Sequence, residues 1–176
     1  KEVGQSFTYK DWELSTDNDF ILFTTHGKVV HGHKFGWFTR PGQCDIYALY
    51  LTFSSQDEKK DQLDKLKGHD ISLKVGFPEA KDRKPFIINA DMDYVFEFSS
   101  LMKIVTIQGF ARGANFDELL SQFHKMTIAI EGPMEQYFDI PYDEFSLNGY
   151  IAAKTKAQET CEGLTRKRDL KVVLNK

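Results

Sequence analysis

Residues 69–76 read HDISLKVG and decide the class of the fold. Ile71, Leu73 and Val75 alternate with Ser72 and Lys74, which is the period of a β-strand with one apolar face. Further stretches share this strand-like character and are bounded by Gly, Pro and Asp; they span residues 20–25, 44–53, 94–98, 102–108 and 127–131. The pattern predicts roughly seven to nine strands along the chain.

Two segments break the strand pattern. Residues 115–125 (NFDELLSQFHK) place four apolar side chains at i, i+3, i+4 and i+7, and Asn115 suits the N-cap of such a helix. Residues 147–160 (LNGYIAAKTKAQET) are rich in Ala and predict a second helix. We therefore predict a mainly β fold, an antiparallel β-sandwich or open barrel with two short α-helices.

Length and composition favour one folded domain. The 176 residues include 15 Phe, 7 Tyr and 2 Trp, enough apolar surface to offset the entropy of the chain. No linker rich in Pro, Gly or Ser divides the sequence. We expect a single β-rich domain over residues 1–176, with a basic tail from about residue 162 and a last strand at 170–174.

The charge balance argues against two classes of partner. A formal net charge of −3 gives no overall attraction to nucleic acid, and the three cations at 166–168 are too few to change this. The apolar runs are too short to cross a bilayer. We expect neither a nucleic-acid partner nor a transmembrane segment.

Cys44 and Cys161 are the two cysteines of the chain. Paired, they would close a loop of more than a hundred residues and stabilise the fold by about 4–5 kcal/mol in the chain-entropy view. Two buried thiols in a cytosolic protein are the alternative. The chain begins at Lys1 without an initiator Met, which fits a mature exported protein whose signal peptide was removed and equally a trimmed chain.

The C-terminal third carries a recognisable order of elements: FDELLSQFHKMTIAIEG, then EQYFDIPYDEFSLNGYIAAKTKAQETC. This order resembles the closing module of invasion-associated-locus-B-like periplasmic proteins, which are β-sandwiches. The matching positions are Leu119, Leu120, Ile128, Ile130, Phe145, Leu147, Gly149, Ala152, Ala153 and Cys161. The closely spaced cysteine pairs of that family are absent here. The resemblance implies an exported β-rich protein with a structural disulfide, and it carries over no catalytic residue.

The histidines His26, His31 and His33 form the sharpest candidate for chemistry. On a strand, His31 and His33 point the same way, and a turn at Gly27 could bring His26 to them. Such a set could bind zinc or copper. Solvent-facing histidines in a Gly-rich hairpin, which need no cofactor, are the alternative interpretation.

The same hairpin continues into Trp37 and Arg40, residue types that dominate binding hot spots. A ligand or partner surface at His31, His33, Trp37 and Arg40 is one interpretation, and packing of the aromatics in the core is the other. Asp91 and Asp93 could form a cation site or an acid–base pair, but a solvated strand or turn is the favoured interpretation. No nucleophile motif or phosphate loop is present.

These observations predict a non-catalytic, periplasmic or secreted protein that binds a protein partner or small ligand. A metal carrier or metal-dependent enzyme built on the three histidines is the first alternative. A cytosolic or virus-encoded structural domain with free thiols is the second.

Overall fold

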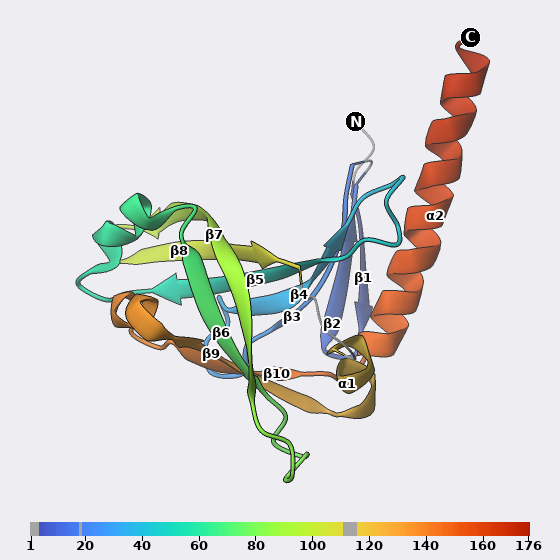
Figure 1. Cartoon of the computed structure of the whole chain (residues 1–176). Helices are drawn as coiled ribbons and strands as arrows, with labels where there is room; N and C mark the ends of the chain where they lie inside the picture. The colour runs from blue at the N-terminus through green and yellow to red at the C-terminus, as the bar shows by residue number, and fades with distance from the viewer. Residues whose placement is uncertain (1–3, 18, 111–115) are drawn as a thin grey trace.

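The computed structural model describes residues 4–17, 19–110 and 116–176. Ten antiparallel strands form one sheet in the spatial order β1-β2-β3-β4-β5-β8-β7-β6-β9-β10 (Figure 1). The strands are β1 (Gln5–Tyr9), β2 (Trp12–Thr16), β3 (Ile21–His26), β4 (Lys34–Thr39), β5 (Ala48–Ser55), β6 (Asp70–Gly76), β7 (Phe86–Ser99), β8 (Met102–Gly109), β9 (Lys125–Glu131) and β10 (Tyr142–Ser146). The predicted mainly β, antiparallel class is confirmed.

The sheet folds over so that its last strand returns to its third. A β-bridge joins Gly27, just after β3, to Phe145 on β10, and the backbone N–H of Lys28 donates to the carbonyl of Glu144 at 3.0 Å. Across the enclosed space, the ring of Phe145 lies 5.8 Å from that of Phe35 on β4. One sheet thus supplies both walls of the core, as in an open barrel.

Trp12 lies at the centre of the core and is fully buried. Its ring packs against Phe23, Phe35 and Tyr150, with centroids 5.2–6.1 Å apart. The indole Nε1–H donates to the carbonyl oxygen of Ser146 at 2.9 Å, so its one polar group is satisfied. This residue therefore joins β2, β10 and the C-terminal helix.

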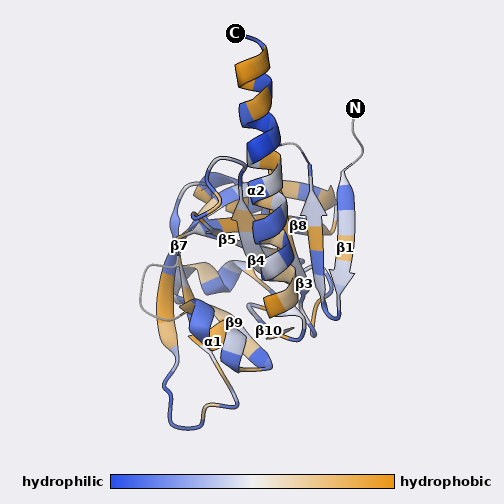
Figure 2. Cartoon of the chain, turned by 90° about the vertical axis from the view of Figure 1, so that its right-hand side faces the viewer, coloured by the Kyte–Doolittle hydropathy of each residue, from blue (hydrophilic) through white to orange (hydrophobic). Residues whose placement is uncertain are grey.

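The C-terminal helix α2 (Tyr150–Leu174) corrects the predicted end of the chain. A helix ending at residue 160 and a strand at 170–174 were expected, but one helix of 25 residues covers both. No Pro interrupts residues 161–174, and Lys, Arg and Leu sustain a helix well. Figures 1 and 2 show the C-terminal part of α2 projecting beyond the sheet.

The start of α2 depends on Gly149. Its φ is +96°, a left-handed conformation that suits Gly, and a Cβ there would lie 1.9 Å from the carbonyl oxygen of Tyr9. The helix can therefore begin directly against the β1–β2 turn. No helix in the described ranges has an apolar stretch of the length needed to cross a membrane.

The remaining helices are short. The predicted first helix appears as α1 (Phe116–Gln122), and its expected N-cap, Asn115, lies outside the described residues. Two 3₁₀ segments, η1 (Lys60–Leu66) and η2 (Gly132–Tyr137), connect strands. Tyr150 on α2 donates a hydrogen bond to Asp117 on α1, and Lys154 forms an ion pair with the same carboxylate at 2.6 Å. These contacts join the two α-helices.

Candidate functional site

The β3–β4 turn, residues 27–33, is held by the carboxylate of Asp143 from β10. The backbone N–H groups of Val29 and Val30 donate to its two oxygens at 2.9 and 3.0 Å. His33 Nδ1 lies 2.9 Å from Oδ2, and because an ionised carboxylate only accepts, this nitrogen is the donor. A Cβ at Gly27 would come within 2.2 Å of the same carboxylate, so the turn needs glycine there.

Asp143 and His33 are both fully buried. Burial by itself would raise the pKa of Asp143, but the hydrogen bonds from His33 and from three backbone N–H groups hold that pKa below its ordinary value. The carboxylate of Asp143 therefore holds the β3–β4 turn against β10 through these hydrogen bonds. Sequence reasoning did not single out this role, because nothing local in the sequence links residue 143 to residue 33.

The three histidines that the sequence offered as metal ligands do not lie together, because His33 is buried by its hydrogen bond to Asp143 whereas His26 and His31 lie at the surface. His33 points inward, its ring 4.2 Å from that of Phe53. His26 and His31 stack at the surface with centroids 4.1 Å apart, and His26 Nδ1 donates to the carbonyl of His31 at 2.7 Å. Within residues 4–17, 19–110 and 116–176, no group of three or more His, Cys, Asp or Glu side chains is placed to hold a metal ion.

Trp37 and Arg40 also lie apart. Trp37 is 7% exposed and packs in the core against Phe35 and Phe116, which is the packing alternative left open by the sequence. Arg40 is exposed, and its guanidinium lies 5.2 Å from the centre of the Phe38 ring. Of the four residues expected at a binding surface, His31 and Arg40 remain accessible, whereas His33 and Trp37 are buried.

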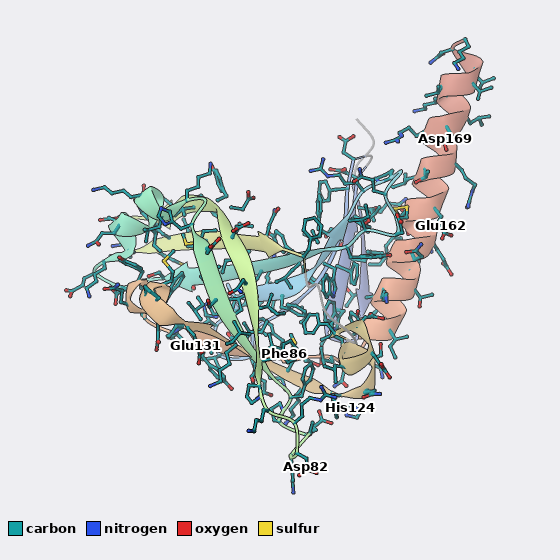
Figure 3. All side chains as sticks on the ribbon, viewed as in Figure 1. Asp82, Phe86, His124, Glu131, Glu162 and Asp169 are labelled. Atoms are coloured by element: carbon teal, nitrogen blue, oxygen red, sulfur yellow. A yellow bond between two sulfur atoms is a disulfide. The ribbon has the colours of Figure 1, made fainter. Side chains whose placement is uncertain are left out.

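Cys44 and Cys161 are paired, with their Cα atoms 5.8 Å apart. The disulfide attaches the loop after β4 to α2, beside Glu162 in Figure 3. Two hydrogen bonds support the attachment: Gly42 N–H donates to Thr165 Oγ1 at 2.7 Å, and Arg168 donates to the carbonyl of Pro41 at 3.1 Å. The middle of α2 is thereby fixed to the sheet.

A groove of about 560 Å³ lies next to this attachment, and Cys44, Tyr47 and Lys154 are among the residues that line it. Two of its polar groups already have protein partners: Tyr47 donates to Gln158, and Lys154 pairs with Asp117. The groove therefore offers a ligand few free polar contacts.

A different surface stands out on the β7–β8 hairpin. Tyr94, Phe96 and Phe98 on β7, called the aromatic row below, are 51%, 38% and 67% exposed, and Leu101 in the following turn is 73% exposed. Tyr94 pairs with Thr106 and Phe96 with Ile104 on β8, so both rings lie on the same face of the sheet. Their centroids are 6.0 Å apart.

The sequence already contained a signal for the aromatic row. Its aromatics alternate with Val95 and Glu97, which correctly predicts a strand. In the structure Val95 packs against the core and the larger aromatic side chains face outward. The alternation gives the period of the strand, but it does not say which of the two faces is buried.

Acidic side chains continue the outward face beyond Tyr94. Asp91 lies directly opposite Asp70 on β6 and opposite Gln108 on β8. A hydrogen bond with Asp70, some burial and the repulsion between the two carboxylates raise the pKa of Asp91. Asp91 and Asp93 are both exposed on β7, and the carboxylate opposite Asp91 is that of Asp70 across the strands.

Comparison with known proteins finds no matching family model, no matching curated protein and no matching solved structure. The resemblance to invasion-associated-locus-B-like proteins stays a prediction, because nothing in these comparisons bears on it.

Proposed function

We propose that this protein is a non-catalytic, exported binding protein whose protein partner or small ligand contacts the aromatic row on β7. The observation that carries the proposal is the exposure of Tyr94, Phe96 and Phe98 together on one hairpin, with Leu101 beside them. Grouped exposed apolar side chains are typical of interaction sites, whereas single exposed ones are common on any surface.

Burial of the aromatic row by a partner would be energetically favourable. Aromatic side chains have large surfaces, and removing apolar area from water stabilises a complex by roughly 25 cal/mol per Å². Tyr and Phe are also enriched in protein interfaces, where rigid rings lose little conformational entropy on binding. A partner that covers two or three of these rings gains affinity without any rearrangement of β7.

The disulfide supports an exported location. Disulfides form and persist in oxidising compartments such as the periplasm and the extracellular space, and are rare in the cytosol. The bond between Cys44 and Cys161 fixes α2 to the loop after β4, so its loss would release part of the fold. A periplasmic or secreted protein keeps this bond.

The proposal is tested by affinity capture with matched surface variants. The full chain is immobilised as wild type, as Phe96→Ser and as Ile151→Ser, where Ile151 is an exposed apolar residue on α2 that is 58% exposed. From a cell-envelope extract of the source organism, we expect Phe96→Ser to retain bound material about tenfold more weakly, the loss typical of an interface hot spot. Ile151→Ser is expected to behave as the wild type.

Equal retention by all three chains would contradict the proposal. Equal melting temperatures of the variants provide the control for folding, because neither side chain is part of the core.

A further inference from the structure

The carboxylates of Asp70 and Asp91 form a like-charged pair at one end of the aromatic row. They occupy directly opposed positions on β6 and β7, where two negative charges destabilise a sheet. In the described part of the chain, neither takes part in an ion pair with Lys, Arg or His. The pair is therefore a place where an added positive charge would be stabilised.

The pair and the aromatic row belong to one continuous surface. Asp91, Tyr94 and Phe96 face Gln108, Thr106 and Ile104, which are alternate residues of β8, so all six side chains point to the same side of the sheet. Alternate residues of a strand are about 7 Å apart. Two carboxylates are thus followed, at the spacing of an extended chain, by two aromatic rings.

A cation already lies on this surface. The ammonium of Lys67 is 5.2 Å from the centre of the Tyr94 ring, a cation–π distance. Beyond Tyr94, β7 pairs only with β8 among the described strands, since the register with β6 ends at Asp91. The outer edge of β7 between Tyr94 and Ser99 thus has no strand neighbour in the described residues, although η1 packs against β7; the exposed face of the aromatic row stays open to an extended segment.

We infer that the aromatic row and the Asp70–Asp91 pair together bind an extended, basic segment of a partner polypeptide. This inference rests on the proposed function and names the class of partner. Apolar side chains of the segment pack on Tyr94 and Phe96, and a Lys or Arg side chain reaches the two carboxylates. Charge complementarity selects this occupant, because an anionic lipid surface or an acidic peptide would meet the same carboxylates with repulsion.

The experiment uses two synthetic peptides with opposite charge and the same apolar content. One is an acetylated and amidated octapeptide of alternating Lys and Val, and the other has Glu in place of Lys. Binding of fluorescently labelled peptide to the full chain is measured by polarisation at low and at physiological salt. We expect the Lys peptide to bind and to weaken as salt rises, and the Glu peptide not to bind.

Two double variants separate the contributions of charge. The double variant Asp70→Asn with Asp91→Asn is expected to bind the Lys peptide about tenfold more weakly, which is the effect of losing a close charge pair. Asp82→Asn with Asp169→Asn removes the same number of charges outside β6 and β7, at the tip of the loop before β7 and on α2 (Figure 3). We expect this control to bind as the wild type does.

The outcomes distinguish the two proposals. Loss of binding in Phe96→Ser but not in Asp70→Asn with Asp91→Asn would overturn the basic class of partner and keep the aromatic row as the binding surface. No effect of either change would overturn the inference and remove support for the aromatic row, whereas equal binding of both peptides would overturn only the basic class of partner. Sedimentation with phosphatidylcholine–phosphatidylglycerol vesicles that depends on Phe98, without peptide binding, would overturn it in favour of a membrane surface.

Discussion

In the β3–β4 hairpin the polar side chain of His33 is fully buried, whereas in the β7–β8 hairpin the apolar side chain of Phe98 is 67% exposed. The buried His33 is stabilised because Asp143 accepts its hydrogen bond. The exposed Phe98 has no comparable compensation in the fold. The first hairpin thus uses its unusual residue for stability, and the second leaves its unusual residues exposed on the surface.

The largest expected effect on the free energy of unfolding is at the buried Asp143–His33 contact of the β3–β4 hairpin. Asp143→Ala removes the acceptor for the buried ring of His33 and for the part-buried backbone N–H groups of Val29 and Val30. Because the imidazole of His33 stays buried without its acceptor, we expect the free energy of unfolding to fall by about 3 kcal/mol or more, measured by urea denaturation.

Asp139→Ala is the matched control for Asp143→Ala. Asp139 is an exposed residue that accepts a hydrogen bond from the backbone N–H of Gln56 at 2.9 Å. A net loss of about 1 kcal/mol or less is expected there. If both substitutions lower the free energy of unfolding by the same amount, Asp143 does not hold the β3–β4 turn against β10.

The second prediction concerns pH. The pKa of Asp143 is lowered in the folded protein, so its ionised form is favoured by folding. This contribution is present above the pKa of the unfolded state, about 3.9 for Asp, and is lost as the pH falls through the lower folded-state pKa. Asp143→Asn lacks a titrating group at this position. We therefore expect the stability difference between wild type and Asp143→Asn to shrink below about pH 4, measured by thermal unfolding between pH 2 and 7.

A difference that stays constant over that range would mean that Asp143 is not held in its charged form. The other carboxylates with lowered pKa values, Asp117 and Glu79, are present in both proteins and cancel in the comparison.

The sequence predicts the periodicity of the strands well. It predicts poorly which face of a strand is buried. Ile71, Leu73 and Val75 alternate with polar residues and are buried as the pattern requires. Around Tyr94 the aromatics form the more apolar face of the strand, yet Val95 on the other face packs against the core and the aromatics are exposed, so alternation alone does not report which face is buried. The burial of His33 depends on Asp143, 110 positions away, and no local pattern reports a contact at that separation.

The C-terminal helix shows a related limit. Residues 170–174 (LKVVL) have strand-like composition, but they follow a helix without a break and continue it. Local propensity differs by only a few tenths of a kcal/mol per residue, and extending a helix that is already formed needs no new nucleus, so this composition does not end α2.

The smallest expected effect on stability is on the exposed side of the comparison. Phe96→Ser removes a large aromatic ring from a surface strand, and we expect the free energy of unfolding to change by no more than about 0.5 kcal/mol, because that ring lies outside the core. Trp37→Ala, which removes a ring that is 7% exposed, is expected to cost about 3–5 kcal/mol. Urea denaturation of both variants measures the contrast.

A loss of several kcal/mol in Phe96→Ser would show that the aromatic row stabilises the hairpin itself, and its exposure would then give no reason to expect a partner there. A neutral Phe96→Ser together with a damaging Trp37→Ala would mean that the fold does not need the aromatic row, so that binding would have to explain its presence.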